Sequence, residues 1–288
     1  MHNYTTTSFD PQEQQAIFDN LLKYAIAPRP ICFASTIDAE GHVNLSPFSY
    51  FNLVSQQPPI CVFSPLRRMR DGSTKHTLDN IMEVKEVVIN IVNYNMVQQQ
   101  SLASTEYAKG VNEFEKAGLT PIPSLSIKPP RVAESPIQLE CRVRDIIALS
   151  DQPGAGNLVV AEVLQMHVHK HLLDLNNNID QADLDLVARL GGDWYCRVTK
   201  ENLFVVPKPL RSLGIGIDQL PQHLKSSALL TGNQLGLLAN VEAIPSLEPD
   251  FKMQPPFESL AISHQQIGKL LDENELNAAW QVALRCSE

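Results

Sequence analysis

The chain has 288 residues, of which 43% are hydrophobic and 19% are charged. These fractions are ordinary for a folded globular protein and exclude an intrinsically disordered one. The formal net charge is −9, which argues against nucleic acid as a partner because such binding needs a basic face. No apolar stretch approaches the roughly 18 residues that span a bilayer, so no membrane partner is expected.

The cysteines and the amino terminus indicate the cellular compartment. There are five cysteines and no C-x-x-C pair. The first four, Cys32, Cys61, Cys141 and Cys196, lie in apolar, strand-like runs, which predicts reduced, buried thiols. Residues 1–10 lack the charged-then-apolar pattern of a secretion signal. We therefore predict a cytoplasmic protein.

The first sixty residues are expected to hold one helix and a series of short strands. A lead-in helix is predicted over 13–24, and Pro28 and Pro30 then force extended backbone around Arg29. Apolar and β-branched runs follow, separated by turn residues at 38–41 and 56–59. The predicted strands are Ile31–Ile37, Val43–Leu45, Ser49–Val54 and Ile60–Ser64.

The middle of the chain begins with a polar, basic segment over 67–77. It leads into a predicted helix over Leu78–Val84, with Thr77 as the N-cap. Residues 96–117 are expected to be helix or loop, 121–136 form a proline-rich stretch, and 173–192 form a polar connection. The predicted strands of this part are Glu86–Val92, Ile137–Leu149, Asn157–Leu172, Trp194–Thr199 and Leu203–Val206.

Helical patterns follow Pro207–Pro209, most clearly over Ser263–Leu271 and Glu275–Leu284. Since many short strands with few helices precede them, strict β-α-β alternation is absent. This organisation predicts a mainly β protein with helices (α+β), a barrel or sandwich in preference to a doubly wound sheet. The expected domains are 1–209 and a mainly helical C-terminal extension, 210–288.

Anion-binding residues are concentrated at the start of the predicted helix. Arg67, Arg68, Arg70, Lys75 and His76 fall within ten residues of one another in an acidic chain. A helix amino terminus offers free N–H groups and a partial positive charge, and nearby hydroxyls and cations complete a phosphate site. A solvated basic loop beside an ordinary helix cap explains the same residues equally simply.

A second candidate is the segment from Asn44 to Asn52. It combines hydroxyls, two amides and three aromatic side chains at a bend between strands. An isoalloxazine ring needs a flat apolar slot with hydrogen bonds at its pyrimidine edge. The segment has these groups, although a wall of core aromatics beside a turn has them too.

Together these motifs resemble the flavin reductase–like family of FMN-binding split barrels. Their order and spacing over residues 25–208 carry the resemblance. The matching pieces are Arg29-Pro30, Ser35-Thr36 with the turn at 38–41, Asn44–Ser49, Pro58-Pro59, Asp71–Thr77, Asn80, Val87–Asn90 and Arg189–Tyr195.

The resemblance implies an FMN cofactor near the interface of a homodimer. One departure is His76, since the family usually has Lys-Asp-Thr where this chain has Lys75-His76-Thr77; a histidine would not repel a phosphate. The extension beyond residue 210 is a second departure. The implied cofactor-binding residues are Arg29, Thr36, Asn44, Ser46, Pro47, Phe48, Ser49, Tyr50, Phe51, Asn52, Ser64, Lys75, His76, Thr77 and Arg189.

The implied activity is an FMN-dependent oxidoreductase that transfers hydride from NAD(P)H, or electrons from another donor, to flavin. The protein then needs to orient and desolvate the reactants, so no catalytic triad is expected and no catalytic residue is assigned. The alternatives are an electron-transfer flavoprotein without its own substrate and a noncatalytic split-barrel binding module. The extension is expected to pack across the dimer or cover the site.

Two further motifs are interpreted as structural. His167, His169 and His171 alternate, so they share one face of a strand and could bind Zn²⁺ or Ni²⁺. No cysteine or carboxylate partner is evident nearby in the sequence, and a polar strand face is the simpler interpretation. Gly214–Asp218 lacks the third glycine of a dinucleotide fingerprint and is expected to be a loop. We therefore predict no metal site.

Overall fold

The computed structural model describes residues 5–206, 213–251 and 259–286. The chain divides into two compact units, 1–203 and 204–288. The predicted domain boundary after residue 209 falls within 207–212, outside the described residues. In the described ranges, no helix has the length and apolar character needed to cross a membrane.

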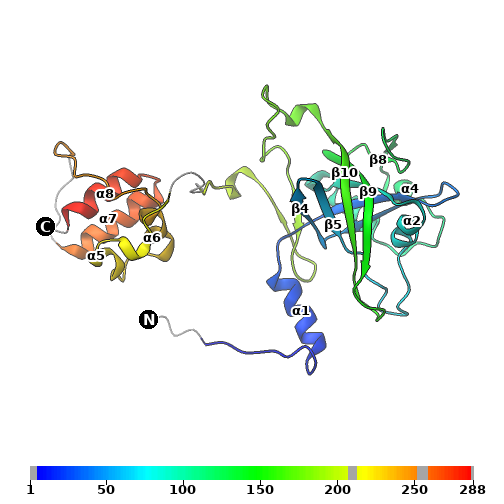
Figure 1. Cartoon of the computed structure of the whole chain (residues 1–288), viewed down its shortest axis with the longest axis horizontal. Helices are drawn as coiled ribbons and strands as arrows, with labels where there is room; N and C mark the ends of the chain where they lie inside the picture. The colour runs from blue at the N-terminus through cyan, green and yellow to red at the C-terminus, as the bar shows by residue number, and fades with distance from the viewer. Residues whose placement is uncertain (1–4, 207–212, 252–258, 287–288) are drawn as a thin grey trace. The chain divides into compact units, whose positions relative to one another are not determined.

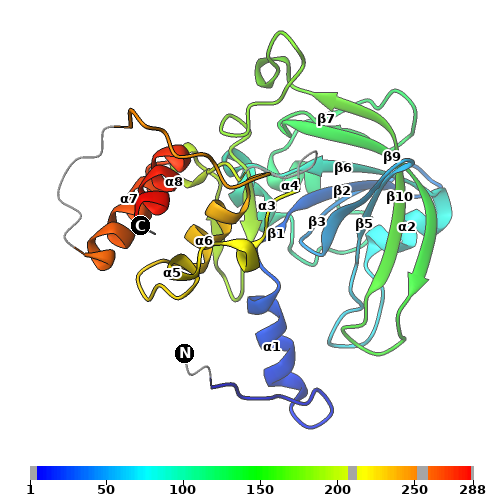
Figure 2. The same ribbon diagram turned by 60° about the vertical axis from the view of Figure 1, so that its left-hand side comes forward.

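The first unit is built on a seven-stranded antiparallel sheet, in the order β3-β2-β6-β9-β10-β5-β4. Figure 1 and Figure 2 show its long central strands, β9 and β10, side by side. This mixed α and β architecture confirms the predicted fold class. The strands are β2 (Cys32–Ile37), β3 (Val43–Phe48), β4 (Phe51–Gln56), β5 (Pro59–Phe63), β6 (Glu86–Ile91), β9 (Ile137–Ala148) and β10 (Asn157–Val168).

Two smaller sheets complete the β structure. One has the order β1-β11-β12, with β1 (Arg29–Pro30), β11 (Val187–Arg189) and β12 (Tyr195–Arg197). The other pairs β7 (Pro121–Ile122) with β8 (Arg131–Val132) inside the proline-rich stretch. In the first of these sheets Arg29 lies opposite Arg189, so the pairing brings two predicted site residues together.

The main sheet is buried on both faces along β2. Side chains alternate across a strand, so neighbours enter different cores. Cys32 and Ala34 pack into one core with Phe63. Ile31 and Phe33 pack into the other, beneath Phe114 of α4. A strand rich in apolar and β-branched residues, as predicted for Ile31–Ile37, is therefore what this doubly covered position requires.

The helices of the first unit are α1 (Gln15–Ala25), α2 (His76–Val84), α3 (Val97–Leu102) and α4 (Glu113–Ala117). Short 3₁₀ turns are η1 (Tyr94–Met96), η2 (Lys170–Leu172) and η3 (Lys200–Asn202). The predicted N-cap of α2 was wrong by two residues: Lys75 is the cap, and Thr77 lies within the first turn. The Thr74 hydroxyl, which precedes the cap, donates to Asp79 Oδ1 in the first part of the helix, 2.6 Å.

Two strand predictions were also wrong. β11 lies inside the segment predicted to be a polar connection, where it pairs with β1 and β12. Residues 203–206 were predicted as a strand but have no strand partner. Their apolar side chains are exposed, and Val205 is 89% accessible. An apolar run forms a strand only where a neighbour can pair with its backbone.

The second unit is helical, as expected for the extension. It contains η4 (Ile217–Gln219), α5 (Gln222–Lys225), α6 (Gly232–Ala239), α7 (Leu260–Asp272) and α8 (Leu276–Arg285). Trp280 is fully buried in a core of its own with Leu238 and Ile267. Thr231 and Gln234 form a capping box at α6, which fixes the start of this helix.

Candidate functional site

A groove of about 430 Å³ opens beside the bend between β3 and β4. Phe48 lies in it, with its ring 5.3 Å from that of Phe63 in the core behind. The groove unites eight of the predicted residues from five separate parts of the chain. Its lining consists of Arg29, Pro47, Phe48, Ser49, Tyr50, Ser64, Lys75 and Arg189, which were predicted, and Asn20, Lys23, Leu66, Gly192 and Asp193, which were not.

Arg29 builds one wall of the groove. Its guanidinium donates to the carbonyls of Lys23 and Ile26 at the end of α1, both at 2.7 Å. It also donates to the carbonyl of Leu190, 3.0 Å, and lies 5.7 Å from the Tyr50 ring centroid. Arg29 therefore joins α1 to the loop after β11 and holds both beside the groove.

The end of β11 and the loop after it line the groove beside Arg29. Arg189 lies over the ring of Tyr195, 4.6 Å from its centroid, and pairs with Asp193 at 3.5 Å. The Tyr24 ring packs so closely on Gly191 that a Cβ at this position would lie 2.4 Å from it. This contact explains the glycine, because any larger residue would push α1 away from the loop.

A small, cationic cavity of about 30 Å³ adjoins the groove at the start of α2. Lys75 lines both spaces, and its ammonium lies 5.4 Å from the Phe48 ring centroid. Burial lowers the pKa of Lys75. The predicted members of the cavity are Asn44, Ser46, Lys75, His76 and Thr77, and the remaining lining is Arg68, Ala103, Ser104, Thr105, Glu106, Tyr107 and Glu113.

The start of α2 presents free backbone donors to this cavity. The amides of Leu78 and Asp79 bond to the carbonyl of Lys75. Within the described part of the chain, no acceptor faces the amides of His76 and Thr77. Helix starts of this kind bind anions through such amides and the helix dipole. The cavity therefore suits a phosphate group chemically.

Asn44 and Thr77 belong to a buried hydrogen-bond chain below the cavity. The Thr77 hydroxyl donates to Asn44 Oδ1, 2.7 Å, and Asn44 Nδ2 donates to Glu113 Oε1, 2.8 Å. Glu113 Oε2 accepts from the Leu45 amide, 3.0 Å. Burial raises the pKa of Glu113. The polar groups of these side chains are thus hydrogen-bonded to one another, and they hold α2 and α4 against β3.

Three predicted residues lie elsewhere. The Thr36 side chain is buried and accepts from Asn80 Nδ2, 3.2 Å. Phe51 packs against the core of the main sheet. The Asn52 side chain accepts from the neighbouring amide of Leu53, 2.9 Å. Since strand neighbours alternate, Phe51 and Asn52 cannot both face the groove.

The residues that sequence analysis missed come from two places. Asn20 and Lys23 lie on α1, whose polar face gave no sign of a ligand. Ser104, Glu106 and Glu113 lie in the segment expected only to be helix or loop. No motif marks that segment, and only the fold brings it to the start of α2.

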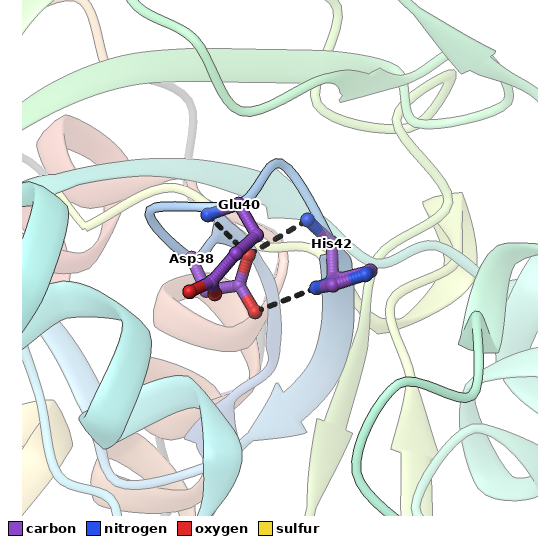
Figure 3. A group of neighbouring side chains, drawn as sticks. All are labelled: Asp38, Glu40 and His42. Carbon is purple, nitrogen blue, oxygen red and sulfur yellow. Dashed lines mark hydrogen bonds and ion pairs between the residues drawn. The ribbon is translucent and has the colours of Figure 1, made fainter.

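One group of described residues could hold a metal ion, namely Asp38, Glu40 and His42 in the turn after β2 (Figure 3). The Asp38 carboxylate accepts from both backbone amides, at 3.1 Å from Glu40 and 2.8 Å from His42. It also contacts His42 Nδ1, 3.0 Å. These bonds close the hairpin turn, which accounts for the cluster without a metal.

The alternating histidines have separate partners. His167 Nε2 lies 2.7 Å from Glu140 Oε1, and His169 Nε2 lies 3.0 Å from the carbonyl of Ala133. The rings of His169 and His171 are 5.7 Å apart. The three imidazoles therefore act in different local contacts.

The antiparallel sheet with the aromatic groove beside it has the organisation of a split barrel of the flavin-related oxidoreductase class. The chain matches the flavin reductase like domain family over residues 24–183, and it belongs to that family. The resemblance drawn from the motifs is thus confirmed. The family match ends before the helical unit.

Similar proteins agree with this assignment. An uncharacterised protein of Aquifex aeolicus is 35% identical over 176 residues, covering 61% of this chain and 87% of that protein. Nitrilotriacetate monooxygenase component B of Bacillus cereus has a TM-score of 0.66 at 31% identity, covering 71% of this chain and 100% of that one. A Shewanella frigidimarina protein named as a flavin reductase with a split barrel domain has a TM-score of 0.57 at 25% identity, covering 70% and 94%.

Proposed function

We propose that the protein binds FMN in the groove and reduces it with NAD(P)H or another electron donor. The observation that carries the proposal is the junction at Lys75. An aromatic groove lies on one side of this side chain and the cationic cavity at the start of α2 on the other. FMN has the same division, with a flat ring at one end and a phosphate at the other.

The residues present fit this cofactor. Phe48 and Tyr50 offer apolar surface to a ring, and Ser49 and Ser64 offer hydroxyls. The groove volume lies in the range of cofactor pockets, roughly 300–1,000 Å³. When bound, FMN supplies a ring that accepts a hydride. The chain's own groups bind the phosphate, orient the ring and exclude water, for which no acid–base residue is required.

The simplest activity is an NAD(P)H:flavin reductase or the reductase partner of another enzyme. Similarity to component B of a monooxygenase supports the second form. An electron-transfer flavoprotein without its own substrate is the alternative. The other alternative is a noncatalytic split-barrel module that has lost FMN, and the cations and free amides around the cavity argue against it.

We further propose a homodimer of a cytoplasmic protein. α1 has no buried residue, although Ile17, Leu21 and Tyr24 give it one apolar side. These side chains are 52%, 40% and 53% exposed. A second copy would cover this side and enclose the adjoining groove.

The experiment is an absorbance spectrum of the purified protein, followed by heat release and mass identification of any chromophore. Oxidised-flavin maxima with released FMN, or tight binding of added FMN, support the proposal. A colourless protein that binds no FMN contradicts it. Oxidation of NADH and NADPH with added FMN then separates a reductase from an electron-transfer protein.

A further inference from the structure

The cationic cavity already contains a carboxylate from the chain itself. Glu106 Oε1 lies 3.6 Å from Arg68 Nε, and Glu106 Oε2 lies 3.7 Å from Arg70 Nη1. The Arg68 side chain is only 15% exposed, whereas that of Glu106 is 54% exposed. The field of Glu106 also acts to raise the pKa of Lys75, against the larger effect of burial. One carboxylate thus acts on two cations of the cavity wall, Arg68 and Lys75, and on the neighbouring exposed Arg70.

The cavity leaves little free space beside these cations, about 30 Å³, so a phosphate that contacts them takes the place that the Glu106 carboxylate now holds. Something in the lining must give way, and the half-exposed Glu106 is freer to move than buried Ala103, Thr77 or Glu113.

We infer that Glu106 is an internal competitor for the FMN phosphate, which weakens FMN binding and lets the flavin exchange. Carboxylate and phosphate recognise the same cations through the same charge-assisted bonds. A phosphate that enters must displace Glu106 from Arg68 and Arg70. Riboflavin has no phosphate and does not compete. This inference rests on the proposed FMN site and assigns a specificity-determining residue in it.

The test compares E106Q with the wild-type chain. Glutamine keeps the size of the side chain but removes the charge that competes with phosphate. Glu115→Gln is the matched control, because this exposed carboxylate on α4 accepts from Asn112 and has no cationic partner among the described residues. Dissociation constants for FMN and riboflavin are measured by flavin fluorescence at low and high salt.

We expect E106Q to bind FMN about fivefold tighter at low salt, with riboflavin affinity unchanged and the gain reduced at high salt. FMN affinity that is unchanged or weaker in E106Q overturns the inference, since Glu106 would then be neutral or would preorganise the arginines. An equal gain for riboflavin overturns it too.

The same binding measurements test the proposed function separately from the role of Glu106. If wild-type protein binds FMN in preference to riboflavin and E106Q does not differ, only the role of Glu106 fails. If wild type and E106Q both bind no FMN, both proposals fail. Binding of FMN by E106Q alone supports the competitor role.

Discussion

Lys75 is the side chain on which the phosphate assignment depends, because it lines both the groove and the cavity. Changing Lys75 to Ala removes a charge-assisted contact worth about 1.5–3 kcal/mol. We expect FMN to bind roughly 10- to 100-fold more weakly, with little change for riboflavin. Titration with both flavins measures this, and exposed Lys200→Ala serves as the control. Equal losses of affinity for FMN and riboflavin would contradict a phosphate site at Lys75.

Glu113 supports the site from below. Its carboxylate accepts from Asn44 Nδ2 and the Leu45 amide, both buried. Glu113→Ala leaves these donors unpaired, so we expect the free energy of unfolding to fall by about 2 kcal/mol. Urea unfolding measures the change. Glu115→Ala on the same helix should cost far less, and equal losses in the two variants would contradict the role given to Glu113.

Residue-level prediction succeeded where sequence neighbours share a wall of the site. Pro47, Phe48, Ser49 and Tyr50 reach the groove because one strand end and its bend carry them all. The prediction failed where consecutive strand residues point to opposite faces, as at Phe51, which packs on the core of the main sheet. It also missed Glu106, whose position depends on how a loop without a motif packs against α2. Such long-range contacts have no local pattern in the sequence.

At the scale of elements, the strands of the main sheet were predictable because most combine β-branched or apolar residues with bounding turns. β11 was not, since it has only three residues and follows an acidic connection. Residues 203–206 have the composition of a strand but no partner for it. Local composition thus indicates capacity for a strand, and the available neighbours decide whether it forms.

The packing of α5 against α7 includes a pair of histidines. His223 Nδ1 lies 3.1 Å from His264 Nε2, and the rings stack 5.4 Å apart. Burial lowers the pKa of both histidines, and the charge of His264 lowers that of His223 further. Below about pH 6.5 the unfolded chain therefore binds more protons than the folded chain. The contribution of the two histidines to the stability of the helical unit is therefore complete above this pH and is lost as the pH falls.

Trp280 reports this unit because it is fully buried, and Trp194 of the first unit can be replaced by Phe. In that background we expect the urea midpoint of Trp280 fluorescence to be lower at about pH 5.5 than at about pH 7.5. An added His264→Asn change should reduce the difference, whereas exposed His171→Asn should not. If the protein with both histidines unchanged has the same urea midpoint at the two pH values, the histidine pair does not make the stability of this unit depend on pH.

At the scale of the whole molecule, the two units have separate cores. The two cores around the main sheet contain no residue beyond 203 among the described ones, and the core around Trp280 contains none before 215. The family match also stays within the first unit. The barrel therefore has what it needs to fold alone, and we expect the helical unit that follows it to serve the dimer or the site.

Truncation after Pro209 tests that purpose. Because the cores are separate, we expect the shortened chain to keep the β-rich circular dichroism spectrum and a cooperative unfolding transition. If the extension packs across the dimer or covers the groove, the truncated protein should dimerise less tightly or bind FMN more weakly. Sedimentation measures the first and flavin titration the second, with the full chain at equal concentration as the control. If the truncated protein dimerises and binds FMN as tightly as the full chain, the extension serves neither the dimer nor the flavin site. Its role would then lie in contacts with another partner.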